Sequence, residues 1–295
     1  MKLFTRFFFP VLLFALCYAT AQISDKDTLL LKKHIEFLCN DSLAGRDAGS
    51  EGEMIAVQYV EDVFTFQKIN YFFQDGFSES FIFINYAGEI QMSRNVAGII
   101  NHDADSTIII MAHLDHLGLG GVKSKSYTMS KIHYGADDNA SGVSLLLLIS
   151  KYLKDKQFSA YNFLLLGTGA HEPGFFGAGS FIRKYGKKLD KVKLVVNLDM
   201  VGRQQKPEVI YALTNEKARK MFEQSPIHIS VMTHKVTVAE LEEGDHTPFD
   251  RAGFPVIHIT TGMHDDYHKV SDTPDKINYQ GMINIMNFIL DLLKI

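Results

Sequence analysis

Histidine and carboxylate residues stand directly after short apolar segments at several places in this 295-residue chain. Taken singly, such residues are weak signals, because a lone histidine after a strand is usually an ordinary polar residue and a lone aspartate before a helix is usually a cap. Taken together, unpaired imidazoles and carboxylates on one rim would repel one another and resist desolvation. Divalent cations relieve that cost, and mixed histidine and carboxylate ligation suits Zn²⁺. The residues concerned are His113, Asp115, Asp138, His171, Glu172, Asp199 and His268.

Apolar runs that alternate with amphipathic segments must position these side chains. Periodicity predicts strands at 96–100, 107–112, 162–166, 192–198, 209–212 and 256–259, and antiparallel strands within 71–92. It predicts helices at 25–39, 51–66 (with Ser50 as N-cap), 141–153, 177–185, 216–223 and 279–293. Continuous apolar strands between helices indicate an α/β fold of three layers, with a mostly parallel, twisted sheet covered by helices on both faces. Ligands of such sheets bind at the carboxyl ends of the strands, where the polar residues stand.

Composition limits the classes of function. The chain is 46% hydrophobic and 22% charged, and its formal net charge is −4. It has no basic block and no stretch in which basic and aromatic residues alternate, so we expect no nucleic-acid partner.

The first residues have the pattern of a secretory signal peptide. Lys2 and Arg6 precede an apolar run over 7–19, and Ala19-Thr20-Ala21 supplies the small residues of a cleavage site before Gln22. The apolar run is shorter than the roughly 20 residues that a helix needs to span a bilayer. The sequence therefore predicts a signal peptide at 1–21 and export to the periplasm or the extracellular space, with no membrane span in the mature chain.

The mature chain, 22–295, shows no repeat and no linker, so we expect a single domain. Cys17 would leave with the signal peptide. Cys39 then remains alone, on the apolar face of a predicted helix, where burial is the better interpretation than a nucleophilic role.

Four motifs together resemble the co-catalytic two-zinc aminopeptidases, metallopeptidase family twenty-eight. This family includes secreted bacterial leucyl aminopeptidases, glutamate carboxypeptidases and the single-zinc glutaminyl cyclases. The segment 43–52, Leu-Ala-Gly-Arg-Asp-Ala-Gly-Ser-Glu-Gly, also resembles the entry to that domain. The four motifs are His113-Leu-Asp115-His-Leu-Gly, Gly-Ala-Asp-Asp138-Asn-Ala-Ser-Gly, Asn197-Leu-Asp199-Met, and Tyr267-His268 with Ser271-Asp272-Thr273.

The resemblance implies a role for each metal-site residue. Asp138 would bridge two zinc ions, and its peptide bond to Asn139 would be cis. His113 and Asp199 would complete one ion, and Glu172 and His268 the other.

The resemblance also implies roles beside the metals. Asp115 would accept the other ring N–H of His113 and so fix its tautomer. Tyr267 would direct its phenol at the scissile carbonyl oxygen and stabilise the oxyanion. His116 is expected at the mouth of the site.

One position departs from the family pattern. Family members carry Glu-Glu where this chain has His171-Glu172, and the first Glu is the general base. Three explanations stay open: His171 itself takes the proton, another acid replaces the missing Glu, or the protein binds metal and peptide with little or no turnover. The acids considered for the second explanation are Glu240, Glu242, Glu243 and Asp245.

The functional expectation is an exported zinc aminopeptidase that acts on peptides with a free N-terminus, by means of water activated by two Zn²⁺ ions. Other divalent transition metals are compatible with the ligand set. A weakly active or inactive homologue that binds metal and peptide is the alternative. Glutaminyl cyclisation is a minor alternative, since it predicts loss of the first metal's ligands and retention of the base Glu, and this sequence shows the reverse.

Overall fold

A computed structural model describes residues 25–127, 130–189, 191–205, 210–223 and 244–294. Within these residues, eight strands form one mixed sheet in the order β1-β3-β5-β4-β6-β8-β7, with β2 paired to β3 beside this path. The strands are β1 (Asn70–Tyr71), β2 (Ser78–Ile84), β3 (Ile90–Ile100), β4 (Thr107–His113), β5 (Asn162–Thr168), β6 (Val192–Leu198), β7 (Tyr211–Thr214) and β8 (Val256–Thr260).

The centre of the sheet is parallel and its flanks are antiparallel. β5, β4, β6 and β8 run in the same direction, whereas β1, β2 and β3 on one side and β7 on the other run against their neighbours. The central strands are apolar at nearly every position because both of their faces are covered. In β4, for example, Ile108 and Ile110 belong to one core cluster, and Ile109 and Met111 belong to the other.

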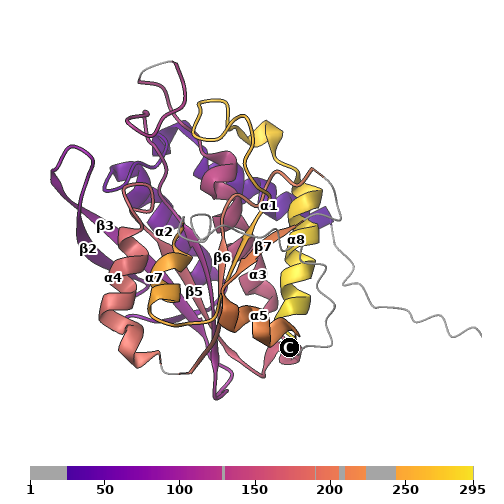
Figure 1. The fold of residues 1–295 in the computed structure, drawn as a ribbon. Helices are drawn as coiled ribbons and strands as arrows, with labels where there is room; N and C mark the ends of the chain where they lie inside the picture. Colours follow the sequence, from indigo (N-terminus) through magenta and orange to yellow (C-terminus); the bar gives the residue numbers. More distant parts are fainter. Residues whose placement is uncertain (1–24, 128–129, 190, 206–209, 224–243, 295) are drawn as a thin grey trace, which may run out of the picture.

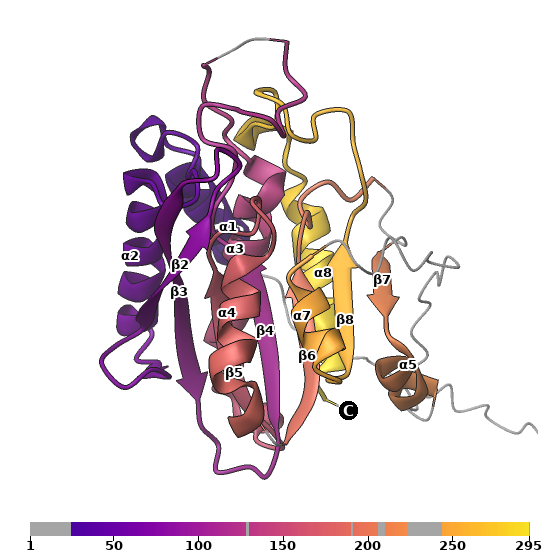
Figure 2. The ribbon, with the colours of Figure 1, turned by 60° about the vertical axis from the view of Figure 1, so that its left-hand side comes forward.

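Helices cover both faces of the sheet (Figures 1 and 2). The larger core cluster packs one face against α1 (Asp25–Leu38), α2 (Glu51–Phe66), α3 (Gly142–Tyr152) and α8 (Tyr279–Leu292). The smaller cluster packs the other face against α4 (Phe176–Tyr185) and α7 (His246–Arg251). α5 (Glu216–Glu223) packs beside β7 and β8. The predicted three-layer α/β fold is confirmed, and the mostly parallel sheet is confirmed for its centre.

Most predicted elements begin and end within two residues of the observed ones. Ser50 caps α2 as predicted, since its hydroxyl accepts a hydrogen bond from the amide of Glu53. β3 unites the predicted strand at 96–100 with part of the antiparallel segment before it. β7 begins at Tyr211 rather than 209, which is outside the described residues. The periodicity predicts no element at α7, because six residues are too few to show a helical repeat.

The parts of the sequence that concern export lie outside the described residues. The predicted signal peptide, 1–21, falls within the undescribed segment 1–24, so it stays a prediction. Among the described helices, none combines the length and the hydropathy that a bilayer-crossing segment requires.

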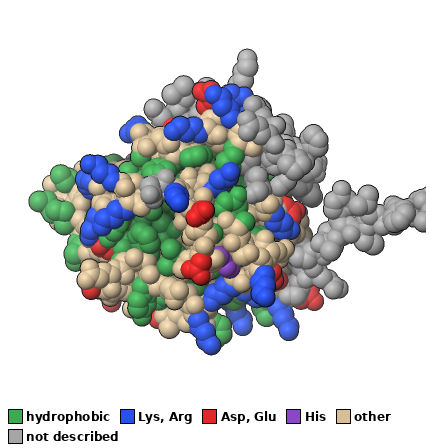
Figure 3. All heavy atoms as spheres, turned by 90° about the horizontal axis from the view of Figure 1, so that it is seen from below, with side chains coloured by type: hydrophobic (Ala, Val, Ile, Leu, Met, Phe, Trp, Pro, Cys, Tyr) green, Lys and Arg blue, Asp and Glu red, His purple; other side chains and the backbone are tan. Residues whose placement is uncertain are grey.

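Figure 3 shows the molecule from below, at the end of the sheet where the parallel strands begin. Basic, acidic and hydrophobic side chains are intermixed on that face.

The prediction for Cys39 is confirmed. Its side chain is buried at the end of α1, where its thiol lies 3.5 Å from the carbonyl oxygen of Tyr134. Burial raises the pKa of the thiol to about 12, so the thiolate needed for nucleophilic chemistry does not form near neutral pH.

Candidate metal centre

The structure brings the five proposed metal ligands to the carboxyl edge of the sheet. His113 is the last residue of β4, and Asp199 directly follows β6. Glu172 lies in the loop after β5, and His268 lies in the loop after β8. Asp138 belongs to η2 (Ala136–Ser141), the helical turn that precedes α3. All five side chains are buried.

Asp138 stands between two sets of donor atoms. Its Oδ1 lies 3.2 Å from Nε2 of His113, and its Oδ2 lies 3.2 Å from Nε2 of His268. On the first side, His113 Nε2 is 3.5 Å from Asp199 Oδ1. On the second side, His268 Nε2 is 3.4 Å from Glu172 Oε2. Two donor atoms that share a tetrahedral zinc at about 2.1 Å are separated by about 3.4 Å, so both sets have the spacing of metal ligands.

The two histidines at the ends of this cluster present the same ring nitrogen. His113 Nδ1 lies 3.0 Å from the carbonyl oxygen of Asp115, and His268 Nδ1 lies 3.1 Å from that of Lys123. A carbonyl only accepts hydrogen bonds, so each Nδ1 carries a proton and each Nε2 is the nitrogen that can bind a metal. Nε2 of His113 is buried and has no hydrogen-bond partner among the described residues. A divalent cation would satisfy such a buried imidazole nitrogen beside carboxylates, so the residues fit zinc.

The expected role of Asp115 needs a correction. Its carboxylate does not hold His113, since the backbone carbonyl of Asp115 does so instead. The carboxylate points toward the loop after β5, where Oδ1 accepts from the amide of His171 at 2.8 Å and Oδ2 from the amide of Glu172 at 3.0 Å. Two backbone N–H groups that lie side by side match both oxygens of one carboxylate, whereas the ring of His113 can use the nearer backbone oxygen. Asp115 therefore shapes the loop that carries Glu172.

The turn around Asp138 is fixed from two directions. Oδ2 of the buried Asp272 accepts hydrogen bonds from the amides of Asp137 and Asp138, at 2.9 and 3.1 Å. The side chain of Asn139 donates to the carbonyl of Leu198 at 2.9 Å, which joins the turn to the end of β6. The peptide bond between Asp138 and Asn139 is cis, as the resemblance implied. These contacts place the carboxylate of Asp138 next to the end of β6.

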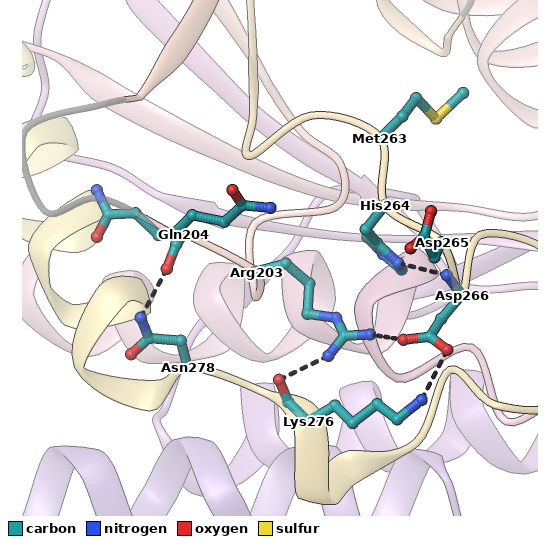
Figure 4. Close-up of a pocket in the computed structure, with 9 residues that line it drawn as sticks. Arg203, Gln204, Met263, His264, Asp265, Asp266, Lys276 and Asn278 are labelled. Atoms are coloured by element: carbon teal, nitrogen blue, oxygen red, sulfur yellow. Dashed lines mark hydrogen bonds and ion pairs between the residues drawn. The ribbon is translucent and has the colours of Figure 1, made fainter.

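The loop that carries His268 is held by a cluster of charges around Asp266 (Figure 4). Asp266 accepts from Lys276 Nζ and from Ser271 Oγ, each at 2.6 Å, and pairs with the guanidinium of Arg203. Burial alone raises the pKa of Asp266, but these three partners outweigh it and lower the pKa to about 2. Arg203, Asp266 and Lys276 also line a pocket of about 460 Å³, together with Met263.

The pKa shifts of the cluster without metal show that its buried carboxylates stabilise positive charge on their neighbours. Burial lowers the pKa of His268, but the carboxylates of Asp138 and Glu172 outweigh burial and raise it to about 10. Burial raises the pKa of Glu172, and hydrogen bonds from His116 and His268 outweigh it and hold that pKa well below its usual range. Protons on the imidazoles thus balance the carboxylates without metal, and bound cations would take over this role.

Two buried residues that the sequence did not single out support the same loops. Arg46 donates to the carbonyl oxygens of Leu114, Tyr134 and Gly135, at 2.9 to 3.0 Å, and also to that of Leu38. The carboxylate of Glu53 on α2 accepts from Ser93 Oγ and from the amides of Gly49 and Ala170. Arg46 lies within the segment 43–52 and Glu53 directly follows it. The resemblance of that segment to the family's domain entry therefore pointed to this region, but it implied no role for either side chain.

Comparisons with known proteins agree with this geometry. A family model described as "Peptidase family M28" matches residues 95–293, about two thirds of the chain. The chain belongs to peptidase family M28. The resemblance expected from the motifs is therefore confirmed, and a metallo-exopeptidase scaffold with a histidine and carboxylate metal site is what this membership supports.

Similar proteins fall into several functional groups. The alkaline phosphatase isozyme conversion protein of Escherichia coli K12 is 27% identical over 257 residues, which cover 78% of this chain and 73% of that protein. A zinc aminopeptidase from Bacillus subtilis has a TM-score of 0.64 at 14% identity, covering 89% of this chain and 93% of its own. A glutaminyl cyclase from Fimbriiglobus ruber has a TM-score of 0.70 at 15% identity, covering 92% and 96%. At these identities the two structures show the fold alone.

His171, at the position where the family pattern has the base Glu, lies beside the first set of ligands. Its ring stacks on that of His113, with centroids 3.7 Å apart and planes 7° from parallel. Its Nδ1 lies 3.3 Å from Oδ2 of Asp245, which is fully buried. Asp245 thus contacts His171, whereas Glu240, Glu242 and Glu243 are outside the described residues.

His116 is not at the mouth of the site. It is fully buried, and its Nδ1 lies 3.1 Å from Glu172 Oε1 and 3.8 Å from Asp138 Oδ2. It adds a second imidazole on the Glu172 side, next to that of His268.

Tyr267 is partly exposed and packs on its neighbour in the chain. Its ring stacks on that of His268 with centroids 3.8 Å apart, and Lys125 Nζ lies 4.1 Å over the same ring. The phenol therefore stands at the edge of the second set of ligands.

A second pocket, of about 380 Å³, adjoins Glu172. The hairpin β2–β3 supplies Phe83 and Tyr86 to its wall, and the loop after β4 supplies Leu117 and Val122. Tyr86 also donates its hydroxyl proton to the carbonyl of Glu172 at 2.7 Å, which ties the pocket to the metal-site loop. The pocket is large enough for one amino-acid side chain and lies directly beside the ligands.

Proposed function

We propose that this protein is an exported metallo-aminopeptidase that hydrolyses the peptide bond next to a free N-terminus. The observation that carries the proposal is the position of Asp138, whose two oxygens face His113 on one side and His268 on the other. A carboxylate in that position can hold two cations, and two Zn²⁺ ions, when bound, activate water and polarise the carbonyl of the substrate. Export rests on the sequence pattern of residues 1–21.

The chain's own residues have distinct tasks in this proposal. His113 and Asp199 would hold the first cation, Glu172 and His268 would hold the second, and Asp138 would contact both. His171 stands on the first side with one ring nitrogen against Asp245 and takes the proton that family members pass to a glutamate. Tyr267 assists at the edge of the site, where its phenol stabilises charge that develops on the carbonyl oxygen.

The substrate class is a peptide with a free α-amine and an apolar first residue. The pocket beside Glu172 has apolar walls from Phe83, Leu117 and Val122, so it favours an aliphatic or aromatic side chain. Asp47 also lines this pocket, and its carboxylate can pair with the ammonium group; Lys123, a further lining residue, carries a positive charge.

A second candidate function is a metal-dependent peptide-binding protein with little turnover. The stack of His171 on His113 favours it, because that ring occupies space beside the ligands where the family pattern has a flexible carboxylate. The likeness to a glutaminyl cyclase is a likeness of fold, and the five residues that we propose as ligands of two metals are all retained in this sequence.

The test compares wild type, His171→Ala and His171→Glu, each loaded with zinc. We expect about two zinc ions per chain in all three, by atomic absorption. We expect wild type to release p-nitroaniline from leucyl-p-nitroanilide but not from its N-acetylated form, and His171→Ala to lower kcat by about 10²-fold, because general acid–base help contributes at least that much.

The other outcomes separate the candidates. Cleavage by His171→Glu alone, with equal zinc content, would replace the hydrolase proposal with the peptide-binding one. A chain that binds no zinc would exclude both.

A further inference from the structure

Asp245 is a buried carboxylate whose purpose the metal site does not explain. It precedes α7, yet its side chain makes no hydrogen bond that caps this helix. Its Oδ2 accepts a hydrogen bond from Thr168 Oγ1 at 2.5 Å, and its Oδ1 has no hydrogen-bond partner among the described residues. Keeping an ionised carboxylate fully buried is costly unless a partner compensates it, so the side chain must be held there by something it faces.

The group it faces is His171. Nδ1 of His171 lies 3.3 Å from Asp245 Oδ2, is buried, and has no other hydrogen-bond partner in the described part of the chain. The two residues are 74 positions apart in sequence, and they meet because Thr168 ends β5 shortly before His171 while Asp245 begins α7 on the same side of the sheet. Thr168, Asp245 and His171 therefore form a continuous polar chain behind the site.

His171 is not a second imidazole ligand of the cation that His113 would hold. The lone pair of an imidazole nitrogen lies in the plane of its ring, and zinc binds at about 2.1 Å along that direction. Two rings stacked 3.7 Å apart and 7° from parallel cannot both direct their in-plane lone pairs at one ion. Because the stack leaves metal binding to His113, the ring of His171 is free for another task.

We propose that Asp245, supported by Thr168, is a positioning residue that holds His171 by Nδ1 and leaves Nε2 as the nitrogen offered to substrate and water. A carboxylate accepts and does not donate, so contact with Asp245 selects the form of His171 that carries a proton on Nδ1. The stack on His113 fixes the plane of the ring, and the carboxylate fixes its rotation within that plane. The catalytic consequence of this arrangement rests on the proposed function, whereas the ring geometry does not.

The experiment uses the full zinc-loaded chain and four variants. Asp245→Asn removes the obligatory acceptor at nearly constant volume, and Thr168→Val removes only the hydroxyl behind it. His171→Ala removes the residue to be positioned. Asp250→Asn is the matched control, because Asp250 lies on the same helix and its side chain accepts a hydrogen bond from Asn215 instead of facing His171. Zinc content and melting temperature are measured for each variant.

The first readout is independent of activity. Two-bond ¹H–¹⁵N spectra of the histidine rings, with His171 assigned by its loss in His171→Ala, report which nitrogen carries the proton. We expect the Nδ1–H form in wild type and in Asp250→Asn, and a changed Nδ1 signal in Asp245→Asn. An Nε2–H form in wild type, or a His171 spectrum identical in wild type and Asp245→Asn, would overturn the inference.

The second readout is kinetic. For leucyl-p-nitroanilide we expect Asp245→Asn to lower kcat by about 10²-fold with less than a threefold change of KM, and Thr168→Val to lower it by about threefold. In the His171→Ala background, Asp245→Asn should have no further effect, because both changes act through one ring. Additive losses would show that Asp245 acts through general stability and would overturn the positioning role.

The two proposals fail in distinguishable ways. If wild type shows no hydrolysis but the ring spectra change as expected, the proposed function fails and the positioning of His171 stands. If wild type hydrolyses the substrate and neither Asp245→Asn nor Thr168→Val changes kcat or the spectra, the function stands and the positioning role fails. An unfolded Asp245→Asn variant leaves Thr168→Val, with the same two readouts, to decide the question.

Discussion

The two sets of residues in the candidate metal centre are built in different ways. The first half consists of His113 at the end of β4 and Asp199 directly after β6, and these strands are hydrogen-bonded neighbours in the sheet. The second half consists of Glu172, four residues beyond β5, and His268, eight residues beyond β8. We call them the strand half and the loop half. Asp138 joins them.

The difference shows which interactions fix the positions of the proposed ligand side chains in each half. In the strand half, the register of parallel strands places the ligands, and ligand position follows from the hydrogen bonds of the sheet. In the loop half, each ligand depends on particular side chains: Asp115 holds the amide of Glu172, and Asp266 holds the loop of His268. The loop half should therefore be the more sensitive of the two to substitutions of residues that touch no metal.

The largest expected effect comes from the residue that the halves share. Asp138→Ala should reduce bound zinc from about two ions per chain to less than one and lower kcat/KM by more than about 10³-fold, because bound metal supplies several kcal/mol of transition-state stabilisation. Zinc analysis and leucyl-p-nitroanilide hydrolysis measure both effects. Asp105→Ala, at a fully exposed carboxylate, is the control. Retention of two tightly bound zincs in Asp138→Ala would contradict the bridging role.

An intermediate effect should separate the halves. Asp266→Asn weakens the hold on the loop of His268, so we expect about tenfold weaker zinc binding in the loop half, the lower end of what supporting residues contribute to metal sites. The substitution is made in a His113→Ala background, which keeps the loop half, and in a His268→Ala background, which keeps the strand half. Competition with a chelator measures zinc affinity in each.

The strand-half background should change by less than twofold. Asp265→Asn is the matched control, because this carboxylate is adjacent, exposed and lines the same pocket. Equal weakening in both backgrounds would show that the two halves do not differ in the way proposed.

The last effect, on folding stability and not on metal binding or activity, concerns a histidine that belongs to neither half. His34 is buried on α1, where Nδ1 lies 2.7 Å from the hydroxyl of Tyr59, and burial lowers its pKa from 6.5 to about 4. Because the unfolded chain binds this proton more tightly, the contribution of His34 to stability is complete above pH 6.5 and is lost as the pH falls toward 4. The loss amounts to at most about 3 kcal/mol.

Urea unfolding of wild type and His34→Gln at pH 7.5, 5.5 and 4.5 measures that contribution. The difference in stability between the two proteins should shrink or reverse in favour of His34→Gln as the pH falls, while zinc content at pH 7.5 stays equal. A constant difference across the three pH values would show that His34 is not the group that titrates.

The same contrast explains how far the sequence could predict the site. The proposed ligands of the strand half, His113 and Asp199, follow long apolar runs. Periodicity, together with the rule that parallel strands end at one edge, therefore predicted the sheet edge at which the structure has them. The His268 end was found through the family motif, because nothing in the spacing of a loop indicates where its side chains lie. The predictions for His116 and for the carboxylate of Asp115 were wrong. For Asp115 the reason is that sequence spacing does not show which backbone amides a buried carboxylate will contact.

The contact between Asp245 and His171 is a part of the site that the sequence could not predict. The sequence placed it in an acidic segment near the site, but its contact with His171 arises from tertiary packing between the end of β5 and the start of α7. α7 itself was too short to be recognised as a helix. A contact between two elements that are distant in sequence, one of them unrecognised, has no local signature.

The hydrogen bonds of Arg46 bear on how much of this chain is needed to keep the candidate metal centre intact. Its guanidinium donates hydrogen bonds to carbonyl oxygens at the end of α1, in the segment after β4 and in the residues that precede η2. The match to the family model begins only at residue 95, so this cation lies outside the part of the chain by which membership is recognised. A fragment trimmed to the matched boundaries would keep every proposed metal ligand but lose Arg46, whose hydrogen bonds join the segment after His113 to the segment that precedes Asp138.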